Sequence, residues 1–220
     1  MQADPRLAGG YRRGDDRRRR GDDQCVLEGG RALNAELKRR RQPALVRAAL
    51  LDAVVHEAIV GGLAGVTVVG VAARAGVSKG ALFHHFPSRQ ALLEAAYAEC
   101  LLRFDRELDD CIARDGAGAG RFTRAYVTAT FNAINAPERD WARFSLTALV
   151  EPAFADLWRT WLTARLQNAP SERDDPRLRA ARLAADGFWL QMLTDPEAQS
   201  APDRTDALLA CILALASPAT

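Results

Sequence analysis

The segment from Val66 to Pro87 has the spacing of two short helices joined by a turn. Thr67 and Ser78 stand where a side-chain oxygen can accept a hydrogen bond from the first turn of a helix. Gly76 ends the first helix, because glycine readily adopts the backbone conformation that closes a helix, and Pro87 stops the second. This pattern predicts a helix-turn-helix that presents its second helix to a partner.

The second of these helices is expected to face DNA. It presents small and polar residues in place of an apolar face, and such a helix fits the major groove. Lys79, His84 and the following Arg89 are expected near phosphates, the alternative being solvated surface charge. Gly80 and Ala81 are expected near base edges, where Ala81 offers only a methyl contact.

The residues from Ala75 to Arg89 resemble the signature of the TetR/AcrR family of bacterial transcriptional regulators. The resemblance implies an N-terminal DNA-binding domain and a helical second domain with a small-molecule cavity. Asp186-Gly187-Phe188 is similar to a segment near the penultimate helix of many members. Further matches to the family lie at Arg47, Leu50, Leu51, Ala53, Gly62, Thr67, Ala91, Leu92 and Leu93.

Several positions depart from the family pattern. Phe83 stands where the family usually has a tyrosine whose hydroxyl meets a phosphate, and Ala81 stands where it often has threonine. Val69 and Gly70 replace polar residues, whereas Arg89 replaces a lysine and keeps the charge. Fewer hydrogen-bond donors therefore remain on this surface, and we expect a modest affinity for DNA.

Residues 1–42 form an extension rich in arginine and glycine, a composition that buries too little apolar surface to fold alone. Residues 1–43 carry 12 Lys and Arg against 7 Asp and Glu, whereas residues 97–220 carry 14 against 18. Positive charge thus gathers at the DNA-binding end. The extension is either a disordered tail without a role or a basic arm that reaches along DNA. The expected DNA-binding residues are Thr67, Ser78, Lys79, Gly80, Ala81, Phe83, His84, Arg89, Arg39, Arg40 and Arg41.

Helical periodicity covers the rest of the chain, without the alternation typical of strands. We predict an all-α fold with a disordered basic extension (1–42), a helix-turn-helix DNA-binding domain (43–90) and a helical ligand-binding and dimerisation domain (91–220). A long helix from Ser88 to Arg114 joins the last two. The other expected helices span residues 43–60, ending at Gly61-Gly62, and about 121–135, 139–150, 153–169, 176–194 and 203–216.

All four tryptophans lie between residues 141 and 189. Aromatic residues at helical spacing are often ordinary core, but the family resemblance implies a cavity in this domain. An aromatic lining suits a small apolar or aromatic effector. The expected ligand-binding residues are Phe104, Tyr126, Phe131, Trp141, Phe144, Trp158 and Trp189.

The last helix is apolar on every side from Ala207 to Ala216. Such a helix must be buried all round, and a terminal helix of a small domain rarely is unless another subunit covers it. We therefore predict a homodimer through the last two helices, with burial inside its own domain as the alternative. The preceding helix is the one around Leu178, Ala181, Ala185, Phe188 and Met192, and the two helices of each copy could form a four-helix interface.

No enzymatic chemistry is indicated. The four cysteines form no C-x-x-C pair and do not stand at metal-ligand spacing with the three histidines, and neither a catalytic triad nor a Gly-rich phosphate loop occurs. We predict no catalytic residue, metal or cofactor. Buried, reduced thiols are expected, with a redox sensor at Cys100 and Cys111 as the alternative. Without a transmembrane-length apolar run or a secretory signal, a cytoplasmic protein with no membrane partner is expected.

Together these features predict a ligand-responsive, sequence-specific DNA-binding regulator. It is expected to be a repressor that a small apolar or aromatic effector releases from a double-stranded operator. The alternative is a weakly specific DNA binder driven by the basic N-terminal arm.

Overall fold

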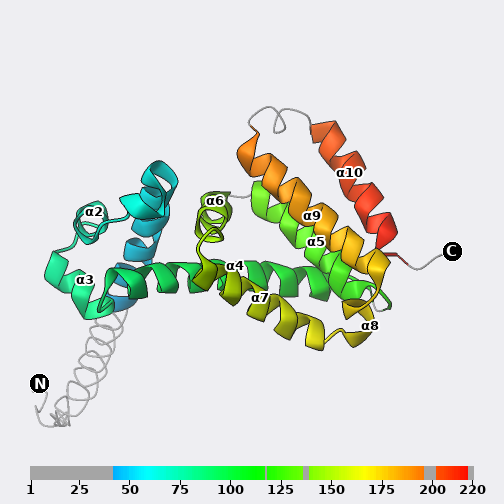
Figure 1. The fold of residues 1–220 in the computed structure, drawn as a ribbon, viewed down its shortest axis with the longest axis horizontal. Helices are drawn as coiled ribbons and strands as arrows, with labels where there is room; N and C mark the ends of the chain where they lie inside the picture. Colours follow the sequence, from blue (N-terminus) through cyan, green and yellow to red (C-terminus); the bar gives the residue numbers. More distant parts are fainter. Residues whose placement is uncertain (1–41, 117, 136–138, 196–201, 218–220) are drawn as a thin grey trace, which may run out of the picture. The chain divides into compact units, whose positions relative to one another are not determined.

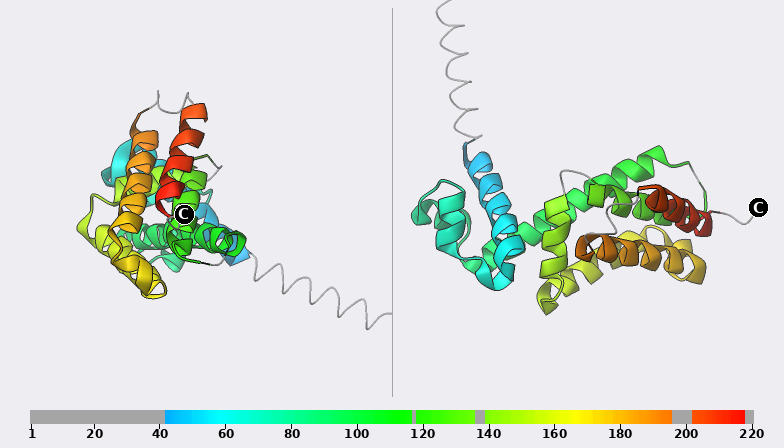
Figure 2. Two further views of the ribbon diagram at one scale, coloured as in Figure 1. Left: turned by 90° about the vertical axis from the view of Figure 1, so that its right-hand side faces the viewer. Right: turned by 90° about the horizontal axis from the view of Figure 1, so that it is seen from above.

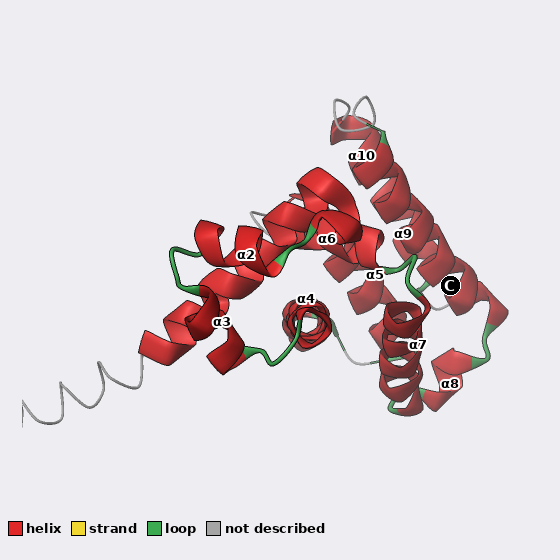
Figure 3. Cartoon of the chain, turned by 60° about the vertical axis from the view of Figure 1, so that its left-hand side comes forward, coloured by secondary structure: helices red, strands yellow, loops and turns green. Residues whose placement is uncertain are grey.

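The computed structural model describes residues 42–116, 118–135, 139–195 and 202–217 (Figure 1). Within these ranges the chain is helical and has no strand (Figure 3), which confirms the predicted all-α class. None of the described helices is long and apolar enough to span a membrane. Residues 47–220 form one compact unit, and the domain limits at residues 42 and 90 remain predictions. Cys25 and Arg39, Arg40 and Arg41 lie outside the described residues.

The first helix occupies residues 42–65 of the described chain. Helical structure thus continues beyond the predicted end at Gly61-Gly62, although Gly62 has the positive φ of 67° that glycine readily adopts. Leu50, Val54 and Ala58 lie on one face of this helix and are buried. This face is the one that helical spacing predicted.

Two hydroxyl caps start the helices of the predicted helix-turn-helix. α2 (Val68–Arg74) begins at Thr67, whose Oγ1 accepts a hydrogen bond of 3.0 Å from the backbone N–H of Gly70. α3 (Lys79–His85) begins at Ser78, whose Oγ accepts a hydrogen bond of 3.1 Å from the backbone N–H of Ala81. Each cap satisfies a donor that a helix end leaves unpaired.

The turn between α2 and α3 depends on Gly76, which has a φ of 67°. Its N–H donates to the carbonyl of Ala73 at 3.2 Å, and the N–H of Val77 donates to the carbonyl of Ala72 at 3.0 Å. This pair of bonds is a Schellman motif. Gly76, which the sequence analysis placed at the end of this helix, therefore sets the direction in which the chain enters α3.

The long helix α4 (Arg89–Arg114) begins after the cap Ser88 and ends where it was predicted to end. The sequence analysis did not predict the short helix α8, because it spans too few residues to show a periodic pattern. α5 and α9 match their predicted bounds. The remaining helices are α5 (Arg121–Asn135), α6 (Arg139–Ala148), α7 (Pro152–Gln167), α8 (Pro170–Arg173), α9 (Pro176–Thr194) and α10 (Pro202–Leu215).

The centre of the second domain is α5, which packs against α4 and α9, while α10 lies beside α9 (Figures 1 and 2). Their facing side chains form one apolar core that includes Leu108, Phe131, Phe188 and Ile212. Because α5 is covered on several sides, most of its residues are buried.

A buried carboxylate holds the N-terminus of α5. Glu172, 5% exposed, accepts hydrogen bonds from the backbone N–H groups of Phe122 (3.0 Å) and Thr123 (2.8 Å). Arg182 on α9 is equally buried, and it donates to Thr123 Oγ1 at 2.6 Å and to the carbonyl of Glu172 at 3.2 Å. Glu172 thus acts as a helix cap supplied from a distant part of the chain, where a negative charge also suits the helix dipole.

The expectation that α10 is buried all round is not met within one chain. Ile212 and Ala216 are buried, whereas Leu208, Cys211 and Leu215 are exposed. α9 turns one face toward α5 and α10, and the predicted pairing of these last two helices with a second copy stays a prediction. Leu178, Ala181, Ala185, Phe188 and Met192 are buried in the chain's own core.

The cysteines that the structure describes, Cys100, Cys111 and Cys211, form no disulfide. Cys100 and Cys111 are buried as expected, but Cys211 is exposed. The first two lie on α4 about 16 Å apart along the helix axis, beyond the reach of a disulfide within one chain.

We expect Glu172→Ala to lower the free energy of unfolding by about 3 kcal/mol, because it leaves two backbone donors and the neighbouring Arg182 without their buried partner. Urea unfolding followed by circular dichroism measures this loss. The control is Glu151→Ala, at an exposed position before α7 that makes no side-chain cap; its expected loss is below about 0.5 kcal/mol. Equal losses in the two variants would contradict the capping role.

Candidate functional site

The exposed surface of α3 is the candidate DNA-reading surface. Leu82 is fully buried and anchors the helix, while Lys79, Gly80, Phe83 and His84 are exposed and Ala81 is half-buried. The ammonium group of Lys79 lies 5.7 Å from the centre of the Phe83 ring, within cation–π range. The sequence-predicted residues of α3 therefore share one accessible surface with a single lysine on it.

Thr67 and Ser78 stand at the edges of this surface as caps. Each hydroxyl oxygen accepts a backbone hydrogen bond, and each retains its own O–H as a donor. Both residues are exposed. A phosphate contact is therefore compatible with their capping role.

Arg89 is placed differently from the expectation of a phosphate contact. Its Nε donates to the carbonyl of Val66 at 2.6 Å, and one terminal nitrogen donates to the carbonyl of Leu63. The side chain is half-buried, so its main donors tie the start of α4 to the end of the first helix. The sequence analysis could not predict where the Arg89 side chain points, because its orientation depends on two carbonyl groups that are more than 20 residues away in the sequence.

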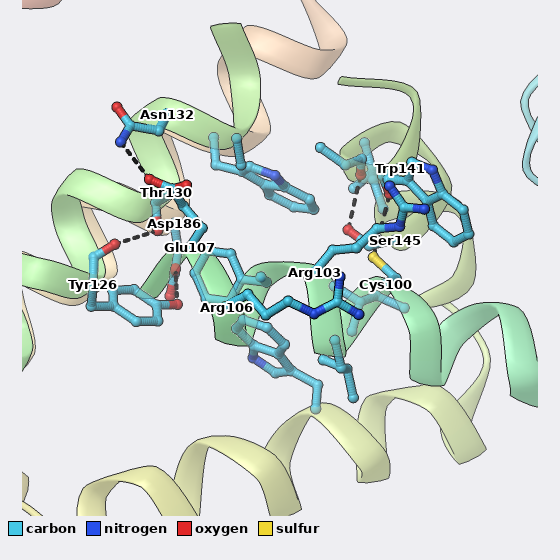
Figure 4. Close-up of a pocket in the computed structure, with 18 of the residues that line it drawn as sticks. Cys100, Arg103, Arg106, Glu107, Tyr126, Thr130, Asn132, Trp141, Ser145 and Asp186 are labelled. Carbon is cyan, nitrogen blue, oxygen red and sulfur yellow. Dashed lines mark hydrogen bonds between the residues drawn. The ribbon is translucent and has the colours of Figure 1, made fainter. Parts of the chain in front are cut away.

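A cavity of about 600 Å³ lies in the second domain. Its walls come from α4, α5, α6, α7 and α9 (Figure 4). The structure brings five of the expected ligand-binding residues to these walls: Phe104, Tyr126, Trp141, Trp158 and Trp189.

The other two expected residues lie elsewhere. Phe131 stacks on Phe188 with ring centres 3.8 Å apart and belongs to the core between α5 and α9. Phe144 is fully buried and does not line the cavity, and its ring lies edge-on to that of Trp141 with ring centres 6.3 Å apart. Helical spacing alone does not fix the rotation that separates a wall residue from a core residue.

Aromatic rings pack against one another along the wall. Phe104 meets Tyr126 edge-on with ring centres 5.7 Å apart and lies 6.0 Å from Trp158. Trp158 in turn lies 5.0 Å from Trp161. Mutual contacts of this kind favour fixed ring positions, so this part of the wall is preformed.

The wall also carries charged groups that the sequence analysis did not select. Asp186 on α9 accepts a hydrogen bond of 2.6 Å from the hydroxyl of Tyr126. In Figure 4 these two lie with Glu107 toward one end of the cavity, and Arg103 lies toward the other. The available signal was the position of Asp186 three residues before Trp189, which puts both on one helix face.

Burial raises the pKa of Asp186 above its ordinary value, and this effect is partly offset by the hydrogen bond from Tyr126 and by the positive charge of Arg182. Burial also raises the pKa of the Tyr126 hydroxyl, so that it remains the donor. A carboxylate in this position is less stable in its ionised form than one in water.

The hydroxyl of Tyr97 is a second unusual group on the wall. Tyr97 is 1% exposed, and among the described residues its hydroxyl has no hydrogen-bond partner. Buried polar groups in folded proteins are nearly always paired. Tyr97 thus contributes to the cavity wall, while its hydroxyl lies buried and unpaired among the described residues.

A helix-turn-helix with an exposed second helix, on a chain whose second domain is helical, defines the class of helix-turn-helix DNA-binding proteins. Residues 50–96 match the family model for bacterial regulatory proteins of the tetR family, and residues 120–217 match that for the tetracyclin repressor-like C-terminal domain. The chain belongs to the TetR family of transcriptional regulators, as its signature predicted. This family consists of regulators and not enzymes, which confirms the prediction made from the absence of catalytic motifs.

Similar proteins agree with this assignment. The HTH-type transcriptional regulator BetI of Burkholderia mallei (strain NCTC 10229) is 33% identical over 161 residues, which cover 66% of this chain and 80% of BetI. BetI of Stenotrophomonas maltophilia (strain R551-3) is 33% identical over 145 residues, covering 59% and 72%.

Solved structures share the fold. A TetR-family member from Streptomyces coelicolor A3 superposes with a TM-score of 0.60 at 22% identity, covering 79% of this chain and 99% of that one. The multidrug binding protein EbrR, solved with malachite green, superposes with a TM-score of 0.58 at 24% identity, covering 79% and 98%.

We expect Asp186→Asn to raise the midpoint of thermal unfolding at about pH 7.5 and to raise it less at about pH 4.5. The folded-state pKa of Asp186 is raised, so the folded protein loses stability as the pH rises through that value, and the variant lacks this loss. Asparagine keeps an oxygen that can accept from Tyr126. Differential scanning fluorimetry at several pH values measures the difference.

The control for this measurement is Asp156→Asn, which removes the same charge from an exposed side chain on α7. Its midpoint should stay close to that of the unaltered protein at each pH. A lower midpoint for Asp186→Asn at neutral pH would show that the carboxylate stabilises the fold.

Proposed function

We propose that the chain is a homodimeric repressor that binds a double-stranded DNA operator and leaves it when a small molecule fills the cavity. The observation that carries this proposal is the span of α4. Its first residue, Arg89, is tied to the end of the first helix, and its later turns form a wall of the cavity. As a regulator, the protein would act in the cytoplasm, where its operator lies.

The surface of α3 supports a DNA contact of limited electrostatic strength. Lys79 supplies the cation, and the hydroxyls of Thr67 and Ser78 are placed to donate to phosphates. Gly80 and Ala81 leave room for base edges to approach. Regulators of this family bind operators and ligands and act as dimers, so two copies of α3 would read two half-sites of one operator.

Release requires an effector that binds the two conformations unequally. A molecule in the cavity contacts α4 directly, and a shift of α4 moves the carbonyls that Arg89 holds. The distance between the two α3 helices of a dimer would then no longer match the groove spacing. The hydrogen bonds of Arg89 form a clamp at the start of α4, and later residues of α4 line the cavity. Because the clamp and the cavity wall lie on one helix, no further element is needed to connect them.

Exposed leucines on α9 and α10 support dimerisation. Leu183 and Leu190 project from α9, while Leu208 and Leu215 project from α10. The two helices lie side by side (Figure 2). A second copy that pairs the same two helices would bury these side chains in a four-helix interface.

Selection of bound DNA from a random pool tests the proposal. A palindrome with half-sites spaced for a dimer supports a specific regulator. Recovery of no motif, with binding that disappears as salt rises, supports instead the weakly specific binder with a basic arm. Deleting residues 1–42 checks this alternative, because an arm-driven binder then loses most of its affinity.

We expect Phe83→Tyr to increase operator affinity by about fivefold, since a phenolic hydroxyl adds one hydrogen bond, worth about 1 kcal/mol, to a phosphate. Fluorescence anisotropy with the selected operator measures this change. Unchanged affinity would mean that the hydroxyl missing at this position does not limit binding.

Lys79→Ala should weaken binding and reduce the slope of log affinity against log salt by about one, the value for one phosphate contact. Arg177→Ala, which removes an exposed positive charge from α9, is the matched control. A similar slope change in both variants would indicate a non-specific effect of charge.

We expect the double variant Leu183→Glu, Leu208→Glu to be a monomer in sedimentation equilibrium, because it places charges in the apolar interface. Leu102→Glu alters an exposed leucine on α4 and should leave the dimer intact. A dimeric double variant would place the interface elsewhere.

A further inference from the structure

We propose that the cavity binds a lipophilic organic cation and that the carboxylate of Asp186 holds its positive charge. That this cation is the effector rests on the proposed function, whereas its binding in the cavity does not.

The first observation is the unshared charge of Asp186. One carboxylate oxygen accepts the hydrogen bond from Tyr126, and among the described residues no donor binds the other oxygen and no Lys or Arg forms an ion pair with this group. The nearby Arg182 directs its nitrogens to Thr123 and to the carbonyl of Glu172 instead. A half-buried carboxylate that forms no ion pair carries a desolvation cost, and a cationic ligand would supply the missing partner.

The second observation is the aromatic surroundings. Trp189 lies on the same face of α9 as Asp186, and the rings of Phe104 and Trp158 continue the wall beyond Tyr126. Aromatic faces carry partial negative charge and attract cations, especially ones that shed little water. A carboxylate beside several such faces selects a cation with an apolar exterior.

Three of the other charged wall residues, Arg103, Arg106 and Glu107, are already engaged. Glu107 interacts with Arg114 at 3.3 Å and accepts from Asn132 at 2.7 Å. Arg103 lies over the ring of Trp141 at 4.4 Å and shares Glu99 with Arg106, at 3.1 and 3.6 Å. These two arginines share the carboxylate of Glu99, whereas Asp110, the other charged wall residue, is an exposed carboxylate. Among the described residues, the wall carboxylates without an ion pair are thus Asp186 and Asp110.

The volume also restricts the ligand. At about 600 Å³ the cavity is within the range of sites that enclose drug-sized molecules. The ligand class is therefore a bulky, mainly apolar ion and not a small hydrated amine.

The test compares probes of one shape and different charge. Tetraphenylphosphonium is the cation, tetraphenylborate the matching anion and triphenylphosphine oxide a neutral relative; benzyltriethylammonium is a smaller cation. Quenching of tryptophan fluorescence in the full-length protein reports binding, with calorimetry as a second readout. We expect at least one cation to bind about tenfold more tightly than the neutral and anionic probes.

Asp186→Asn should weaken binding of that cation by about tenfold and leave the neutral probe within about threefold, since only the charge is removed. Asp156→Asn should change neither affinity. The unfolding midpoint of each variant shows that it is folded. Tighter binding of the borate, no binding of either cation, or an unchanged cation affinity in Asp186→Asn would overturn the inference.

Operator release is measured separately with the same probes. Cation binding through Asp186 that leaves the operator complex intact would uphold the cation site and contradict the proposed effector mechanism. Release by neutral or anionic compounds alone would overturn the cation site and leave the repressor proposal standing.

Discussion

The continuity of α4 is the constraint on which the rest of the structure depends. One helix of 26 residues runs from the Arg89 clamp to the wall of the cavity, and its buried face packs against α5, α6 and α7. A helix is stiff because each residue is held by hydrogen bonds to residues one turn away. A displacement at the cavity is therefore carried along the helix axis to the first residue. The DNA-binding unit and the ligand-binding domain share this helix, so a substitution in α4 that changes one of them also affects the other.

Two groups on the cavity wall work against stability. The carboxylate of Asp186 is half-buried and forms no ion pair among the described residues, and the hydroxyl of Tyr97 is buried without a partner in the described part of the chain. By contrast, the buried charges of Glu172 and Arg182 are fully used in holding α5. The difference between these two polar sites is informative, because unsatisfied buried groups gather where a protein binds something.

The helix boundaries could be predicted because local chemistry sets them. Thr67, Ser78 and Ser88 are caps, and the conformation at Gly76 closes α2 regardless of what packs nearby. The direction of Arg89, the burial of Phe131 and Phe144, and the role of Asp186 depend instead on how distant helices rotate against each other. Periodicity leaves that rotation open by a residue or two. The family resemblance thus implied a cavity to which the aromatic residues were assigned, whereas the charge on its wall was visible only in three dimensions.

The origin of the wall residues has a consequence for how such a regulator diversifies. Asp186 and Trp189 lie on α9, which has no part in the clamp at Arg89, while Phe104 lies on the helix that does. Mutations on α9 can thus change which molecule is sensed while the inherited transmission to DNA stays intact. Mutations on α4 alter sensing and response together, so natural selection would be expected to explore new ligands mainly through α9.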